Sequence, residues 1–226
     1  QFGANEDFDK YPRTFEADKD KLTSIGVDYL FHPTVEDFYP KTFSSQITVG
    51  ELGERLCGRF RPGHFNGVAT VCLKLFEVCR ADVAVFGEKD YQQLQVIKAL
   101  VRDFHLPLSI LACPTIREAD GLAMSSRNHY LSADERIIAA VIPQTLMRLR
   151  QTLATNPAIL ASDLLSIARK NLTGVEVQYA EITEGQNLNL ASPKTSICDL
   201  DSPRFFLAVK IGKTRLIDNI SLKGII

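Results

Sequence analysis

Apolar residues recur along the chain in two alternating patterns, one typical of buried strands and one typical of helices. The runs Val83 to Phe86 and Leu108 to Cys113 are apolar and of strand length. Between these two runs, Tyr91 to Phe104 repeats its apolar residues at helical spacing. Before them, Val68 to Cys79 is a strongly apolar helical run. The strand–helix–strand order predicts a parallel sheet with helices on its faces.

The residues before this unit also predict regular structure. Thr14 to Ile25 reads as a helix, because Thr14 is a capping residue, acidic residues fill the first turns and Gly26 can end it. Val27 to Phe31 is predicted to form a short strand.

The pattern changes after Asn128. Ser132 to Glu135 forms a capping box, which predicts a helix to about Leu153, ended by the Thr155 to Pro157 segment. Further elements are predicted for a helix at Ser162–Leu172 and strands at Val175–Ile182, Phe205–Val209 and Arg215–Ile217. The sequence therefore predicts an α/β protein, with one domain over residues 1–125 and a small α+β domain over residues 126–226.

Composition narrows the kinds of partner. The 226 residues are 45% hydrophobic and 23% charged, as in ordinary globular proteins. Because 26 basic residues face 27 acidic ones, we expect no general attraction to nucleic acid or to a membrane, and anion binding has to be local. Five cysteines, without the tight spacing of a zinc site, favour a reducing cytoplasm.

Two segments have the chemistry of phosphate binding. In the first, Gly87 gives a ligand access to the backbone, Lys89 offers a cation and Asp90 could accept ribose hydroxyls or cap the following helix. This segment lies between the end of a predicted strand and the start of a predicted helix. In open α/β sheets, ligands bind at the carboxyl ends of the strands. In the second, Ser125, Ser126 and Arg127 supply three donors in a row. Taken alone, the first segment could instead be a helix start with a capping Asp and a solvated Lys, and the second could be a polar interdomain loop.

A third segment runs from Arg61 to Gly67, where Arg61 and His64 are candidate ligands for a carboxylate or phosphate. The run Gly212 to Thr214 resembles the end of a phosphate-binding P-loop. However, the position that needs the first glycine is Leu207, and a strand is expected to follow rather than a helix. We therefore reject that site.

Taken together, these segments resemble the pantoate–β-alanine ligase family along almost the whole chain. The matching blocks are Gln1–Gly3, Tyr11–Thr14, Arg61–Val68, Phe86–Gln93, Arg117–Asn128 and Arg215–Asn219. The resemblance implies a Rossmann-like nucleotidyltransferase domain followed by a C-terminal lid, assembled as a homodimer. It also implies a magnesium-dependent reaction in two steps, in which ATP and pantoate form pantoyl adenylate and β-alanine then displaces AMP.

The resemblance assigns roles residue by residue. Gln1 and Gln93 are expected to bind pantoate. The nucleotide is expected to contact a longer set: Gly87, Lys89, Asp90, Ile116, Met124, Ser125, Ser126 and Arg127. Ile116 and Met124 would line the adenine pocket, while Lys89 and the Ser125–Arg127 loop would bind the phosphates.

Two features depart from the family pattern. Asp18 matches a magnesium-linked carboxylate, but its neighbours at positions that can be polar in the family are Ala17 and Lys21. The family's His-x-Gly-His motif, on the first strand-to-helix turn, has no match in this sequence. We expect that motif, with the first strand and helix of the domain, to lie upstream of Gln1.

Two alternatives stay open. The chain could be a non-catalytic dimeric remnant that binds nucleotide weakly, because part of the phosphate site is absent from this sequence. It could also be a related ligase for a different acid, although the pairing of Gln1 with Gln93 favours pantoate.

Overall fold

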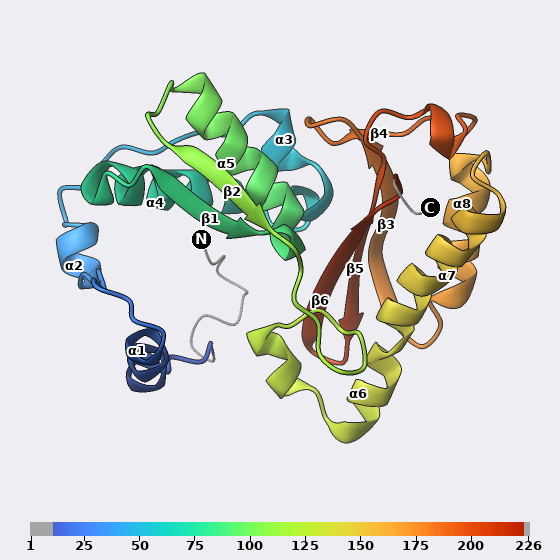
Figure 1. The fold of residues 1–226 in the computed structure, drawn as a ribbon, viewed down its shortest axis with the longest axis horizontal. Coiled ribbons are helices and arrows are strands. Elements are labelled where there is room, and N and C mark those ends of the chain that lie inside the picture. Colours follow the sequence, from blue (N-terminus) through green and yellow to red (C-terminus); the bar gives the residue numbers. More distant parts are fainter. Residues whose placement is uncertain (1–10, 224–226) are drawn as a thin grey trace.

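The structure is a computed structural model that describes residues 11–223, folded as two halves around two separate sheets (Figure 1). The elements of the first half are α1 (Phe15–Ser24), α2 (Val35–Phe38), α3 (Glu51–Glu54), the 3₁₀ helix η1 (Leu56–Arg59), α4 (His64–Cys79), β1 (Val83–Gly87), the 3₁₀ helix η2 (Glu88–Asp90), α5 (Tyr91–Asp103) and β2 (Ser109–Cys113). Those of the second half are η3 (Ser126–Tyr130), α6 (Ala133–Ala139), α7 (Val141–Thr155), α8 (Ala161–Asn171), β3 (Glu176–Glu184), β4 (Asn189–Leu190), η4 (Ile197–Asp199), β5 (Arg204–Ile211) and β6 (Thr214–Ser221).

The first sheet confirms the predicted strand–helix–strand unit. Strands β1 and β2 are parallel, in register from Val83 opposite Ser109 to Gly87 opposite Cys113. Helices α4 and α5 pack on the face that carries Phe86. On the other face apolar side chains are exposed, with Val85 at 60%.

Two expectations for this half need correction. Val27–Phe31 forms no strand, and Tyr29 is 93% exposed. Its backbone has no neighbouring strand to pair with among the described residues, and an unpaired strand gains no ladder of hydrogen bonds. Helix α4 begins at His64, four residues before the predicted start, because Gly63 adopts a left-handed conformation (φ +77°) that turns the chain into the helix.

The second sheet is antiparallel, in the order β4-β3-β5-β6. The predicted capping box at Ser132 and Glu135 is present and opens α6. The predicted single helix is two, because α6 ends at Ala139 and α7 begins at Val141. Pro143 explains the break, since proline has no N–H to continue a helix and is tolerated only in a first turn.

The β5–β6 hairpin settles the Gly212–Thr214 segment. Ile211 pairs with Thr214, so Gly212 and Lys213 form the tight turn between two strands, and Gly212 has a φ of +55°. The residues that follow are a strand, as expected when the P-loop was rejected.

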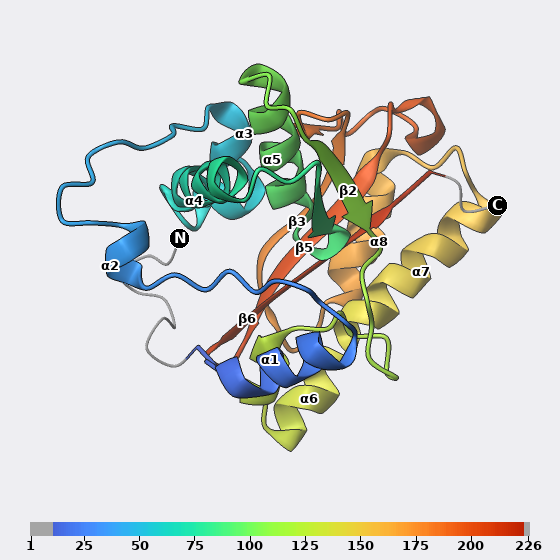
Figure 2. The same cartoon turned by 60° about the vertical axis from the view of Figure 1, so that its left-hand side comes forward.

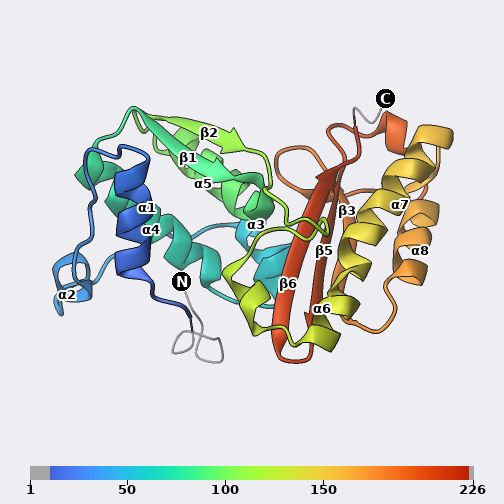
Figure 3. The same ribbon diagram turned by 60° about the horizontal axis from the view of Figure 1, so that its bottom comes forward.

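The two faces of this sheet are covered by different parts of the chain (Figures 1 and 3). Alternate residues of β5, such as Phe205 and Leu207, join the core formed with α7 and α8. Phe206, between them, faces the first half, where it clusters with Leu56 and Tyr179. The first half therefore lies against the sheet face opposite the helices.

The connection between the halves runs from the end of β2 down past α7 and then turns back to η3 (Figure 2). It contains a small turn in which Arg117 bridges to Ala123 and Gly121 has a φ of +86°. The division at residue 125 stays a prediction. Within residues 11–223, no helix is both long enough and apolar enough to cross a membrane.

Candidate active site

A cavity of about 1060 Å³ opens between the two halves. It brings together the three candidate segments singled out in the sequence. Side chains from α4, η2 and α5 of the first half and from η3 and the β3, β5 and β6 strands of the second half line it. The sequence-predicted residues that line it are Arg61, His64, Lys89, Asp90, Gln93, Ser125 and Arg127. A pocket of this size is large enough for a nucleotide and a small acid together.

One wall of the cavity, formed by Lys89 and Asp90, lies at the carboxyl end of β1. Lys89 is partly buried, with 22% of its side chain exposed, and its Nζ lies 3.7 Å from Oδ2 of Asp90. Asp90 stands at the start of α5 but caps no N–H with its side chain, which leaves the carboxylate on the cavity. At Gly87 the position of a Cβ atom would be free of neighbours within 4 Å, so the backbone there is open to a close approach.

The Ser125–Arg127 wall begins at η3. The Oγ of Ser125 accepts a hydrogen bond from the backbone N–H of Arg127 at 3.3 Å, and the Arg127 guanidinium lies 5.7 Å from the centre of the Tyr11 ring. Ser126 is not among the described residues that line the cavity.

The loop before Ser125 is held by a compact ionic network. Arg136 donates at 2.6 Å to both Glu118 and Asp120, and the buried Asn128 donates to Glu118 and to the Ala123 carbonyl. The hydrogen bond from Asn128 holds the pKa of Glu118 below its usual range, and the backbone N–H of Leu122 does the same for the pKa of Asp120.

Ile116 and Met124 are neighbours, since the backbone N–H of Met124 donates to the Ile116 carbonyl at 2.9 Å. Both side chains are exposed, at 66% and 57%, and neither is among the described residues lining the cavity. They form an apolar pair beside the loop that leads to Ser125.

Arg61 and His64 lie together at the start of α4, with Nη1 of Arg61 2.9 Å from Nε2 of His64. Because an arginine N–H can only donate, Nε2 is the acceptor in this contact. The contact holds the imidazole and the guanidinium side by side at the cavity.

Of the described residues that the family resemblance assigns to magnesium and pantoate, only Gln93 is found at the cavity. Asp18 lies on α1, where it accepts from Thr14 and pairs with Lys21 at 3.8 Å, and it is not among the described cavity residues. The described part of the chain contains no group of three or more histidine, cysteine, aspartate or glutamate side chains close enough to hold a metal. The described residues alone form no such cluster, and magnesium is commonly held by one or two carboxylates together with the phosphates of a substrate. Gln93 lines the cavity, and Gln1 lies outside the described residues.

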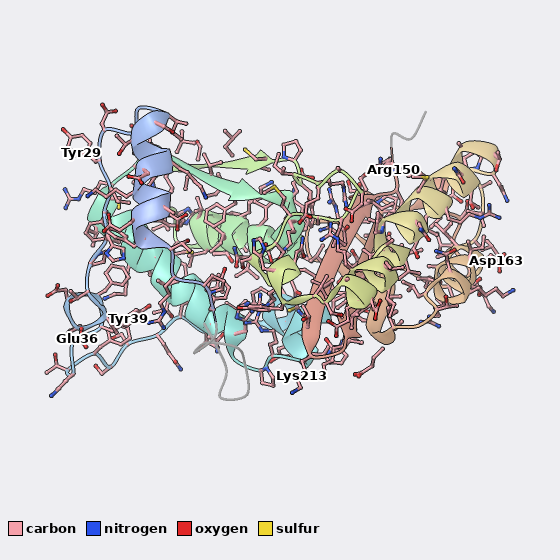
Figure 4. The ribbon with its side chains drawn as sticks, turned by 90° about the horizontal axis from the view of Figure 1, so that it is seen from below. Tyr29, Glu36, Tyr39, Arg150, Asp163 and Lys213 are labelled. Atoms are coloured by element: carbon pink, nitrogen blue, oxygen red, sulfur yellow. The ribbon has the colours of Figure 1, made fainter. Side chains whose placement is uncertain are left out.

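Sequence reasoning missed the contribution of the second sheet. Lys210, Lys213 and Arg215 of the β5–β6 hairpin also line the cavity. Figure 4 shows Lys213 well apart from Arg150 and Asp163 on the outer helices. A signal was present in β6, where Asp218 and Asn219 lie between the apolar Ile217 and Ile220, because buried polar residues in a strand need specific partners.

Comparison with known proteins identifies the family. The sequence profile described as Pantoate-beta-alanine ligase matches residues 1–221. The chain belongs to the pantoate–β-alanine ligase family. The pantothenate synthetase of Pseudomonas fluorescens strain Pf-5 is 46% identical, over 98% of this chain and 77% of its own length. That of a Sulfurihydrogenibium species is 45% identical, over 97% of this chain and 78% of its own length.

Solved structures agree with this placement. The crystal structure of pantothenate synthetase from Thermus thermophilus superposes with a TM-score of 0.91 at 38% identity, covering 98% of this chain and 79% of that one. The Francisella tularensis pantoate–β-alanine ligase, complexed with a β,γ-ATP compound and β-alanine, gives 0.72 at 34% identity, covering 96% and 73%. The family resemblance and the predicted fold class are therefore confirmed: a nucleotidyltransferase-like α/β domain followed by a C-terminal domain.

Proposed function

We propose that this protein is the ligase that joins pantoate to β-alanine at the expense of ATP. A carboxylate oxygen of pantoate attacks the α-phosphorus of ATP, and the bond to the β-phosphate breaks to release pyrophosphate. The amine of β-alanine then attacks the acyl carbon of pantoyl adenylate, and AMP leaves as the amide forms and the ammonium proton is lost to solvent. Membership of the family supports this reaction, and so does the Francisella relative, which was solved in complex with a β,γ-ATP compound and β-alanine.

The observation that carries the proposal is that Lys89 and the Ser125–Arg127 wall line one cavity, although 35 residues separate Lys89 from the first serine. Negative charge builds on the α-phosphate during adenylation. Fixed cations and donors stabilise that charge more in the transition state than in the ground state. Neither step needs a general acid or base of unusual pKa.

Roles for the other predicted residues follow from their places. Gly87 and Asp90 lie beside Lys89 and suit the ribose, whereas the exposed pair Ile116 and Met124 offers an apolar surface for adenine. Gln93 supplies an amide for the pantoate hydroxyls or carboxylate, and Gln1 is its proposed partner.

Arg61 and His64 are proposed substrate contacts, since their fixed pair can bind a carboxylate or phosphate. The second domain is proposed to act as a lid that keeps water from the acyl adenylate. The use of magnesium, homodimer formation and a cytoplasmic location are further proposals that rest on the family alone.

The test is pantoate-dependent exchange of pyrophosphate into ATP, measured on the full-length enzyme. We expect exchange with pantoate, and AMP production once β-alanine is added. Exchange with another acid but not with pantoate would refute the substrate assignment. Exchange with no acid, together with weak nucleotide binding, would favour the non-catalytic alternative.

The phosphate role of Lys89 is tested by Lys89→Ala. We expect kcat to fall by roughly 100- to 1000-fold, the usual effect of removing one fixed donor from a developing anion. The matched control is Lys98→Ala on α5, where the residue is exposed to solvent and activity should stay normal. Near-normal turnover in Lys89→Ala, in a folded protein, would exclude the role.

A further inference from the structure

The turn that carries Lys89 is held by the opposite half of the molecule. Asn219 lies on β6, and its side-chain Nδ2 donates to the backbone carbonyls of Glu88 at 3.0 Å and Lys89 at 2.9 Å. Both hydrogens of one amide group are thus used on two consecutive carbonyls of η2. Asn219 is 4% exposed, so water competes little for these bonds.

The other end of the Asn219 amide is also fixed. An arginine can only donate, so the atom of Asn219 that faces Arg204 on β5 has to be the acceptor Oδ1. The Nδ2 group at the other end of the amide therefore faces η2. Arg204 in turn lies 3.6 Å from the centre of the Tyr91 ring and 3.3 Å from Oε2 of Glu88. Two strands of the second sheet therefore contact the Lys89 turn through its backbone carbonyls and through the side chains of Glu88 and Tyr91.

The residue before Asn219, Asp218, is linked through Arg117 to the loop that leads to Ser125. The buried carboxylate of Asp218 accepts from both terminal nitrogens of Arg117, at 2.7 and 3.0 Å. Arg117 also donates to the carbonyl of Gly121 at 3.0 Å, within the turn that leads to Ser125. Adjacent residues of one strand are therefore tied to both segments that we expect to bind phosphate.

We propose that Asn219 is a positioning residue that sets where Lys89 stands in the ATP site. This inference rests on the proposed function. Lys89 is a long, flexible side chain, so the reach of its ammonium depends on where its backbone is fixed. A displacement of the order of 1 Å at a reacting centre lowers rates by roughly 100-fold. If Asn219 acts in this way, its loss matters only while Lys89 is present.

The test begins with Asn219→Asp in the full-length enzyme. This change keeps the size of the side chain and an oxygen for Arg204, but it points a carboxylate oxygen at the two carbonyls that Nδ2 had bound. We expect kcat for pyrophosphate exchange to fall by roughly 10- to 100-fold, with a much smaller change in the KM for pantoate.

The control is the same chemical change elsewhere in the second domain. Asn171→Asp removes a donor that reaches the hydroxyl of Thr145 at 2.8 Å, among the helices and away from the cavity. Its exchange activity should stay within about twofold of the parent, because it disturbs the domain without touching either phosphate wall. A loss equal to that of Asn219→Asp would contradict the inference.

The deciding measurement is a double-mutant cycle with Lys89→Ala. We expect Asn219→Asp to cost less than about threefold in the Lys89→Ala background, since residues that act as a unit are not additive. An undiminished loss in that background overturns the inference and leaves Asn219 a structural residue. If Asn219→Asp fails to fold, Asn219→Ala takes its place in the same cycle, with the same two outcomes.

The two proposals fail separately. Normal exchange in Lys89→Ala would exclude the phosphate role of Lys89 and with it the inference. Impaired exchange in Lys89→Ala, combined with normal exchange in folded Asn219→Asp, would overturn only the inference about Asn219.

Discussion

The ion pair between Arg117 and Asp218 offers a direct test of how the two halves are held together. The Asp218 side chain is fully buried, whereas Arg117 keeps 30% of its side chain exposed. The hydrogen bond to Asp218 raises the pKa of Arg117 above its already high ordinary value. Asp218 also accepts from the backbone N–H of Asn219 at 2.8 Å.

In Asp218→Asn the side chain keeps its size but loses its charge, and its NH₂ group faces a guanidinium nitrogen that can only donate. Removing one partner of a fully buried pair costs about 3–5 kcal/mol. Because water still reaches part of Arg117, we expect about 2–4 kcal/mol. For a chain of this length that corresponds to a fall in Tm of roughly 5–15 °C.

The assay is urea and thermal unfolding of the parent and of two variants. The matched control is Asp103→Asn, which breaks a pair of similar length (2.8 Å to Arg102) whose side chains are 60% and 56% exposed. That change should cost less than about 0.5 kcal/mol, because exposed pairs contribute little. A difference between the two variants below about 1 kcal/mol would refute the view that burial makes the Asp218 pair important.

Three further predictions concern residues outside the ATP site. Gly58→Ala would bring a Cβ atom to 1.9 Å from the carbonyl oxygen of Gly53, so we expect a loss of at least about 2 kcal/mol in the free energy of unfolding. Gly50→Ala, with no atom within 4 Å, is its control, and equal stability of the two variants would contradict the geometry. Burial raises the pKa of Cys72 from its ordinary 9.0 to about 11, so alkylation at pH 8 should modify the exposed Cys79 well before Cys72. Because the pKa of Cys72 is higher in the folded than in the unfolded chain, the stabilising contribution of its buried thiol is fully present below pH 9 and is lost as the pH rises from about 9 to about 11. A free energy of unfolding that does not change over this range would count against the burial effect.

Much of the first half followed from local patterns. The apolar strands and the amphipathic α5 were predicted almost to their ends, because hydrophobic period and length specify such elements with little outside help. The capping box at Ser132 was equally readable. The segment Val27–Phe31 was predicted wrongly, because a strand exists only where another strand pairs with it, and the sequence does not reveal that neighbour.

The candidate site divides in the same way. Lys89 and the Ser125–Arg127 segment stand out in the sequence because cations, hydroxyls and glycine are concentrated in a few residues, and the family resemblance gives them a reaction. Their roles stay predictions, as do those of Asp18 and Gln1. The structure adds that most of these residues line a common cavity, which no local pattern could show.

The amino-acid sequence by itself determined most of the elements, the family and the chemical character of the two candidate phosphate-binding segments, since each of these depends on residues close together in the chain. Only the tertiary structure decided which groups Asn219 and Asp218 contact. Asn219 lies 130 residues after Lys89, and Asp218 lies 101 residues after Arg117. The sequence around a polar residue in a strand does not reveal which distant groups its side chain will bind. The reason is physical: a side-chain amide or carboxylate contributes through the groups it meets when buried, and those groups are set by packing between the two halves.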